Sequence, residues 1–210
     1  NTKYYPNSHR LNLPSIEEVV SRRLDPLFDF QDYISKKIQN YLLVKDKSQF
    51  MVQMPTGSGK TRTMMHALIH HIAEKNDCTI VWLAHTEELC EQAIDTFKGS
   101  WQTYGTGFKN IYRLFGNRNI LPHEYIESSI YFGSLQKFHS LIKKDDPTIQ
   151  KIACSNKILV FDEAHKALAK TYHDTIEYLM ESSQNNKLVG LTATPGRNVK
   201  YKIENEDRKS

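Results

Sequence analysis

Short apolar runs alternate with amphipathic stretches along most of this 210-residue chain. The runs are too short for helices and are typical of buried strands in a parallel sheet. In the stretches between them, apolar residues recur at the spacing of one helix face. This alternation predicts an α/β fold with a central, mostly parallel sheet and helices on both faces. The expected strands span residues 50–54, 79–84, 110–115, 129–132, 158–161 and 188–191, and the expected helices 31–44, 63–69, 86–97, 135–142 and 171–180.

The pattern is weaker at both ends of the chain. Ser15 is followed three residues later by Glu18, a capping box that predicts a helix from Ser15 through about Leu24. We therefore expect an N-terminal extension with a short helix over residues 1–27 and one domain over residues 28–198. Residues 199–210 are charged and unpatterned, which favours a tail or the start of a linker.

Composition is that of an ordinary soluble globular protein, with 39% hydrophobic and 25% charged residues. No apolar stretch approaches the ~20 residues of a membrane helix, and the first residues lack the apolar core of a signal peptide. Cys78, Cys90 and Cys154 form no CxxC pair, so we expect inert thiols in a reduced cytoplasmic setting. The net charge of +4 permits a polyanionic partner without requiring one.

A glycine-rich loop, MPTGSGKT at residues 54–61, separates an expected strand from an expected helix. Gly57 and Gly59 allow successive backbone N–H groups to surround an anion at the start of the helix. Lys60 is placed to reach phosphate oxygens, and the Thr61 hydroxyl to ligate Mg²⁺. Met54 stands where the full phosphate-loop pattern has a glycine. The alternative interpretation is a plain glycine turn with a surface lysine.

Two further motifs follow apolar strands. FDEAH at residues 161–165 puts Asp162 and Glu163 just past a strand end, where Asp162 is suited to Mg²⁺ and Glu163 to orienting an attacking water. Paired acids at strand ends also serve as helix caps and solvated turns. LTATP at residues 191–195 offers the hydroxyls of Thr192 and Thr194, although a strand that ends in a Pro-Gly turn explains it without function.

MPTGSGKT, FDEAH and LTATP, in this order, resemble motifs I, II and III of superfamily 2 helicases and translocases. With AHTEEL at residues 84–89 and TATPGR at 192–197, the chain looks like the branch that contains the motor subunits of type I and type III restriction enzymes and certain DNA-repair helicases. The resemblance covers residues 28–197. It implies a P-loop NTPase (RecA-like) fold, the first motor lobe, with a second RecA-like lobe elsewhere in the parent chain.

The resemblance also implies ATP and Mg²⁺ as ligands. Asp162 and Thr61 would hold the metal, Glu163 the hydrolytic water, and His165, Thr192 and Thr194 would couple hydrolysis to movement. The residues that would surround the phosphates are Thr56, Gly57, Ser58, Gly59, Lys60 and Thr61.

Gln31 stands where the family places an adenine-reading glutamine, whose amide both donates and accepts hydrogen bonds. The relatives carry a tyrosine immediately before this glutamine and an arginine three residues before it. Here Phe30 and Phe28 occupy those positions, so the guanidinium contact is lost while base stacking on Phe28 stays open. The alternative is an ordinary glutamine at a helix N-terminus.

A nucleic-acid face is implied at His85 and Thr86, and at Gly133, Ser134 and Gln136, with DNA favoured over RNA. Residues 99–118 also interleave three basic residues with five aromatics and contain no acid, a composition suited to single strands. Alternatively, these aromatics belong to the core. The open functional alternatives are a nucleotide-binding module that is inactive without a second lobe, a restriction-modification motor subunit and an RNA-directed helicase.

One further cluster imitates a metal site. His66, His70 and Glu74 lie on one face of the helix after the glycine loop, but a zincin requires Glu directly after the first His, where Ala67 stands. We interpret the cluster as a solvated polar face. A small phosphotransferase is disfavoured because we see no acceptor-binding lid.

Overall fold

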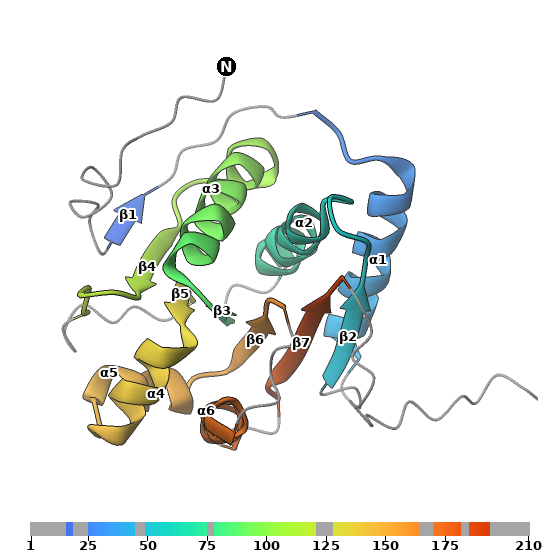
Figure 1. Cartoon of the computed structure of the whole chain (residues 1–210). Helices are drawn as coiled ribbons and strands as arrows, with labels where there is room; N and C mark the ends of the chain where they lie inside the picture. The colour runs from blue at the N-terminus through green and yellow to red at the C-terminus, as the bar shows by residue number, and fades with distance from the viewer. Residues whose placement is uncertain are drawn as a thin grey trace, which may run out of the picture.

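One sheet organises the molecule, with strand order β1-β4-β5-β3-β6-β7-β2 (Figure 1). The computed structural model describes residues 16–18, 25–44, 49–74, 78–120, 128–163, 170–181 and 185–193. Six of the described strands are parallel, and β1 pairs antiparallel with β4 at one edge. The strands are β1 (Ile16–Glu18), β2 (Gln49–Gln53), β3 (Thr79–Ala84), β4 (Asn110–Leu114), β5 (Ile130–Ser134), β6 (Lys157–Phe161) and β7 (Lys187–Thr192).

Helices cover both faces of this sheet, as its continuous apolar strands require. On one side lie α1 (Asp29–Leu43), α2 (Lys60–Glu74) and α3 (Glu87–Tyr104), and on the other α4 (Leu135–Lys143), α5 (Pro147–Cys154) and α6 (Lys170–Met180) (Figure 1). The expected α/β architecture with a RecA-like fold is confirmed.

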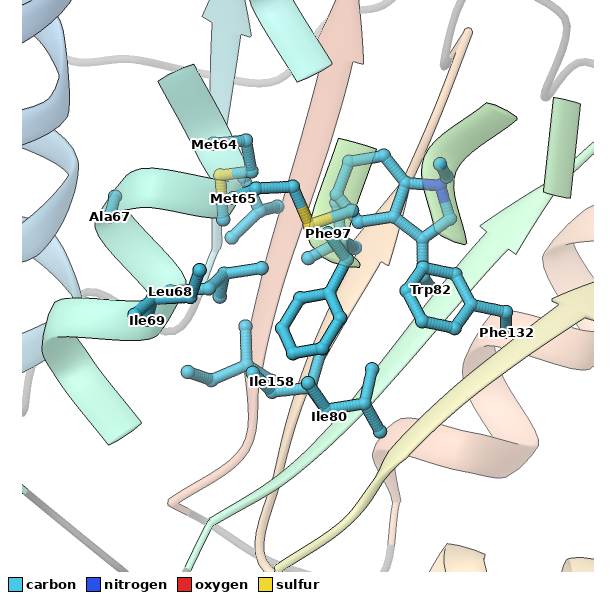
Figure 2. Close-up of a cluster of buried hydrophobic side chains, with 14 of the residues drawn as sticks. Met64, Met65, Ala67, Leu68, Ile69, Ile80, Trp82, Phe97, Phe132 and Ile158 are labelled. Atoms are coloured by element: carbon cyan, nitrogen blue, oxygen red, sulfur yellow. The ribbon is translucent and has the colours of Figure 1, made fainter. Parts of the chain in front are cut away.

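The central strand β3 shows how the two faces are filled. All six of its residues are buried, and successive side chains point to opposite faces. Ile80 and Trp82 join Met64 of α2 and Phe97 of α3 in one core (Figure 2). Val81 and Leu83 join a second core, together with side chains of α4, α5 and α6.

The strand register brings the carboxyl ends of the strands to one edge. Ala84 pairs with Ser134, Leu83 with Phe161, and Gln53 with Thr192. The segments that follow these residues are the glycine loop, the His85–Thr86 turn, the start of α4 and the acidic pair. Open α/β sheets bind their ligands at this edge.

The structure overturns one expected element. Residues 16–18 form strand β1, not the start of a helix, and Ile16, Glu17 and Glu18 pair with Tyr112, Ile111 and Asn110 of β4. A capping box is a local signal worth about 1 kcal/mol, whereas the exposed edge of β4 offers a ladder of backbone hydrogen bonds. Residues 19–24, the rest of the expected helix, lie outside the described part of the chain.

Two helical stretches were not anticipated. α5 begins at Pro147, after Asp146, whose Oδ1 accepts a hydrogen bond from Thr148 N at 2.9 Å. This Asp-Pro start is a recognisable helix signal. α3 continues to Tyr104, beyond the expected end of this helix at residue 97.

Candidate functional site

The glycine loop turns sharply between β2 and α2. Gly57 and Gly59 have φ angles of +77° and +79°, a region that favours glycine. α2 begins directly after them at Lys60, and Thr63 N donates to Gly59 O at 2.9 Å. The loop therefore presents the start of a long helix at the carboxyl edge of the sheet, the arrangement that suits an anion.

The Gln31 side chain is hydrogen-bonded to the backbone of this loop. Its Nε2 donates to Ser58 O at 2.8 Å, and its Oε1 accepts from Phe28 N at 3.1 Å. The side chain is only 4% exposed, and a Cβ on Gly59 would lie 2.3 Å from Gln31 Nε2. The resemblance implied an adenine contact for Gln31 but did not reveal this contact with the loop backbone.

Phe28 and Phe30 lie at the start of α1, and both precede Gln31 in the sequence. Their rings stack with centroids 6.1 Å apart and planes 6° from parallel. Both rings are largely open to solvent, at 69% and 48% exposure. An exposed flat ring beside the glycine loop is a surface on which a base can stack.

The acidic pair lies directly opposite the lysine of the loop. Lys60 Nζ lies 2.9 Å from Glu163 Oε1 and 3.7 Å from Asp162 Oδ1. Asp162 continues from β6, where its N–H donates to Leu83 O at 2.9 Å, and its Oδ1 accepts from Glu163 N at 3.0 Å. Glu163 has φ +57°, a left-handed conformation that is uncommon for residues other than glycine.

Burial and charge oppose each other at Asp162. Its side chain is 8% exposed, and this burial raises the pKa of the carboxyl, while the nearby Lys60 ammonium acts to lower it. A buried carboxylate beside the hydroxyl-bearing first turn of α2 offers the oxygen ligands that Mg²⁺ prefers.

The third motif is hydrogen-bonded to the first residue of the same loop. Thr192 is 1% exposed, and its carbonyl oxygen accepts from Met54 N at 3.1 Å. The backbone end of β7 is thus bonded to the first residue of the loop. His165 and Thr194 lie outside the described residues.

A hollow of about 570 Å³ lies along the same edge between α3 and α4. We call it the edge groove, and it is lined by Thr86, Glu87, Glu88, Gly116, Ser134, Gln136, Lys137 and Ser140. Three of the five expected nucleic-acid residues, Thr86, Ser134 and Gln136, line it. Sequence reasoning missed Lys137 and Ser140, although helical spacing from Ser134 and Gln136 would have found them.

The polar side chains of the edge groove have defined partners. Thr86 Oγ1 accepts from Leu89 N at 3.3 Å and caps α3, and Ser134 Oγ accepts from Lys137 N at 3.3 Å and caps α4. Lys137 Nζ donates to Gly116 O at 3.2 Å. Burial lowers the pKa of Lys137.

The other two expected residues do not line the groove. Gly133 is buried in β5, where a Cβ would lie 2.1 Å from the Phe138 ring. His85 follows β3 and turns toward α6, where its Nδ1 makes a hydrogen bond with the Tyr172 hydroxyl.

The interleaved stretch of residues 99–118 belongs mainly to the core, which confirms the second of its two interpretations and not the strand-stacking surface. Trp101, Tyr112 and Phe115 are at most 4% exposed. Arg113 is fully buried, with Nε 3.4 Å from Glu91 Oε2 of α3. Phe108 is the exception, at 72% exposure. Tyr112 lies inward because β4 is buried along most of its length, and Trp101 lies on the buried side of α3.

The histidines of α2 do not form a solvated face, which corrects that expectation. His66 is 9% exposed, and its Nδ1 lies 2.8 Å from Ser35 Oγ of α1. Burial lowers the pKa of His66 to about 4. His70 is exposed, and the Glu74 side chain lies outside the described part. α2 packs between α1 and α3, and this packing buries one side of the helix that carries polar residues in the sequence.

Two of the three thiols are buried. Cys78 and Cys90 are covered by the core, and burial raises the pKa of the Cys90 thiol, which makes it a poor nucleophile. Cys154 is exposed. Among the described residues, no helix is both long enough and apolar enough to cross a membrane.

The comparison with protein families decides the affiliation of this chain. The family described as "Type III restriction enzyme, res subunit" matches residues 25–197. The chain belongs to this family. Its resemblance to the first motor lobe of superfamily 2 helicases and translocases is thereby confirmed.

The individual relatives of this chain are distant in sequence and much longer. The ATP-dependent DNA helicase mph1 of Aspergillus terreus is 27% identical over 198 residues, which cover 92% of this chain and 17% of the helicase. The ATP-dependent DNA helicase fml1 of Schizosaccharomyces pombe is 25% identical over 197 residues, which cover 92% of this chain and 22% of the helicase. The chain thus spans less than a quarter of the length of these relatives.

The solved structures support the same fold. The helicase domain of Hef from Pyrococcus furiosus superposes with a TM-score of 0.59 at 22% identity. The match covers 81% of this chain and 33% of the Hef chain.

Proposed function

We propose that this chain is the ATP-binding motor lobe of a nucleic-acid-dependent ATPase, within a helicase or translocase that acts on DNA. The observation that carries the proposal is the 2.9 Å ion pair between Lys60 Nζ and Glu163 Oε1. It joins the glycine loop to the acidic pair, so one nucleotide can contact both. The names of mph1 and fml1, both ATP-dependent DNA helicases, favour DNA over RNA.

The residues at this edge fit a magnesium-bound nucleoside triphosphate. Asp162 and the Thr61 hydroxyl would supply oxygen ligands to Mg²⁺. When bound, the nucleotide supplies the scissile phosphoanhydride bond. Lys60 would neutralise phosphate oxygens, and Glu163 would orient a water molecule and accept its proton. The loop residues proposed to surround the phosphates are Thr56, Gly57, Ser58, Gly59, Lys60 and Thr61.

Gln31 and Phe28 are the proposed adenine contacts. The Gln31 amide has a second N–H and a second lone pair beyond those used by Ser58 and Phe28, so it can still meet a base edge. The Phe28 ring is exposed for stacking. His165, Thr192 and Thr194 are proposed to couple hydrolysis to movement.

The edge groove is the proposed nucleic-acid contact, at Thr86, Ser134 and Gln136, with His85 and Gly133 behind it. Hydroxyl and amide side chains at helix starts bind backbone phosphates without reading bases. Lys137 is the cation among the lining residues, beside Glu87 and Glu88. We therefore expect weak, salt-sensitive binding by this lobe alone.

Binding of a fluorescent ATP analogue tests the nucleotide site. The chain should bind the analogue with Mg²⁺, and Lys60→Ala should weaken binding at least about tenfold, since a direct charge contact is worth about 1.5–3 kcal/mol. Lys143→Ala, an exposed lysine of α4, is the matched control and should leave affinity unchanged. Equal affinities in Lys60→Ala and the unchanged chain would refute the proposal.

A second candidate is a nucleotide-binding module that needs another lobe for turnover. Phosphoryl transfer is commonly accelerated about 10³–10⁵-fold by an arginine finger, and the resemblance places that arginine in a second lobe. The match to this chain covers only 17% and 22% of the length of mph1 and fml1, which favours this version. Robust ATP hydrolysis by the chain alone, abolished in Lys60→Ala, would contradict it. A reduced cytoplasmic setting stays a prediction from the cysteines.

A further inference from the structure

Helix α6 lies against the elements of both proposed sites. It covers the sheet face that also carries α4 and α5 (Figure 1). Two of its hydroxyl side chains, Tyr172 and Thr175, lie three residues apart and therefore on one helical face. Each contacts a histidine from an element that borders the edge groove.

Tyr172 connects the end of β6 with the end of β3. Its ring meets the Phe161 ring edge-on, with centroids 5.6 Å apart and planes at 77°. Its hydroxyl makes a hydrogen bond with His85 Nδ1, and the two rings stack at 6.1 Å and 26°. The side chain is only 8% exposed. Phe161 immediately precedes Asp162, and His85 immediately precedes the groove residue Thr86.

Thr175 makes the corresponding contact on the other side of the groove. It is fully buried, and its Oγ1 lies 3.4 Å from His139 Nδ1 of α4. The first turn of α4 carries the groove residues Gln136 and Lys137. A shift of α6 would therefore act on both walls of the groove.

We propose that Tyr172 is a positioning residue that links the acidic pair to the edge groove by holding His85 in place. The inference rests on the proposed function, because it supposes that nucleotide and nucleic acid bind at these two sites. The path is a series of direct contacts from Asp162 through Phe161, Tyr172 and His85 to Thr86. A change in the position of Asp162 is thereby passed through packed rings, which resist compression, to the start of α3.

The hydroxyl adds a specific element to this packing. Burial raises the pKa of Tyr172, so the hydroxyl keeps its proton at neutral pH. The hydroxyl can then donate to His85 Nδ1 when that nitrogen carries no proton. Tyr172 thus holds the orientation of the residue that leads into the groove.

The coupling between the two ligands is the measurement that tests this role. The dissociation constant of a fluorescein-labelled oligo(dT) is measured by anisotropy, with and without saturating Mg²⁺ and the non-hydrolysable analogue AMP-PNP. We expect the nucleotide to change it at least about fivefold. Tyr172→Phe keeps the ring and loses only the hydroxyl. In this variant, the ratio of the dissociation constants with and without nucleotide should fall to within about twofold of unity. The affinity of this variant for oligo(dT) alone, or for AMP-PNP alone, should stay nearly unchanged.

Two further variants separate positioning from mere packing. Tyr178→Phe removes a hydroxyl from the same helix and the same core, and it should leave the ratio unchanged. His85→Leu should reduce the ratio as Tyr172→Phe does, and the double variant should lose nothing more, because both single changes break one contact.

Three results are decisive. If both ligands bind and Tyr172→Phe retains the full ratio, Tyr172 has no linking role. If both ligands bind without influencing each other in the unchanged chain, the inference also fails, although the proposed function survives. If the unchanged chain binds neither AMP-PNP nor oligo(dT), the proposed function itself falls, and the inference with it.

Discussion

Lys60 Nζ lies 2.9 Å from Glu163 Oε1, although the two residues are 103 positions apart in the sequence. The contact exists because β2 and β6 are parallel strands of one sheet and end at the same edge. A triphosphate in the glycine loop would compete with Glu163 for this ammonium group. The same carboxylate that is proposed to activate water therefore also opposes nucleotide binding.

This competition gives the first prediction. Glu163→Gln removes one negative charge while keeping the shape of the side chain, so the Mg²⁺-bound ATP analogue should bind several-fold more tightly. ATP hydrolysis by the parent protein should fall about 10²–10⁴-fold, because a general base is lost. The two effects are measured by fluorescence titration and phosphate release. Weaker analogue binding in Glu163→Gln would show that the carboxylate assists the nucleotide instead.

The two loop glycines make a matched pair for the second prediction. Their φ angles are nearly equal, so Ala at either position brings a similar strain of about 1–2 kcal/mol. A Cβ at Gly57 meets nothing within 4 Å, whereas one at Gly59 would displace Gln31. In urea unfolding, Gly59→Ala should therefore lose about 1 kcal/mol more than Gly57→Ala, through the broken bond to Ser58. The difference should vanish when Gln31 is also Ala.

The fold was predictable because its signals are local. β3 spans the same residues as its apolar run, since a strand buried on both faces needs apolar side chains throughout. β1 was not predictable, because only three residues pair and the partner, β4, lies far along the chain. There the local helix signal at Ser15 pointed to a different structure.

The candidate site shows the same division. The loop and the acidic pair could be placed together because parallel strand ends share one edge. The bond from Gln31 to Ser58 could not, because it depends on how α1 packs against α2. His66 was misinterpreted for a related reason: seven consecutive residues of α2, 63–69, are buried, so helical spacing no longer separates an inner from an outer face.

The buried His66 gives the third prediction. Its pKa is about 4 in the folded chain and about 6.5 when unfolded, so the unfolded state binds the proton first. The free energy of unfolding should therefore decrease as pH falls from about 6.5 to about 4, by at most about 3 kcal/mol. His66→Gln should lose this decrease, while the exposed His70→Gln should keep it. Urea titrations across this pH window measure it, and identical pH profiles for His66→Gln and the unchanged chain would contradict it.

Lys137 gives the fourth prediction, which concerns the edge groove. If its ammonium pairs with one backbone phosphate, Lys137→Ala should reduce the slope of log affinity against log salt for oligo(dT) by about one. Lys137→Arg should restore the slope. Lys143→Ala, in the last turn of the same helix but outside the groove lining, is the control. An unchanged slope in Lys137→Ala would place the phosphate contacts elsewhere.

The fifth prediction uses the ion pair that joins α3 to β4. Arg113 is fully buried and lies 3.4 Å from Glu91, whereas Lys36 and Asp32 form an exposed pair at 2.7 Å. Burial makes the longer contact the more important one, because each ion of a buried pair depends on its partners within the protein and not on water. Glu91→Ala should destabilise the chain by about 3–5 kcal/mol, and Asp32→Ala by less than about 1 kcal/mol.

Replacing both buried partners distinguishes charge from packing at this position. Glu91→Leu combined with Arg113→Met should recover much of the stability lost in Glu91→Ala, because apolar side chains then replace the buried ion pair. Urea unfolding measures all three variants. If Glu91→Ala costs no more than Asp32→Ala, the guanidinium of Arg113 is satisfied by other groups, and the link between α3 and β4 rests on the apolar core alone.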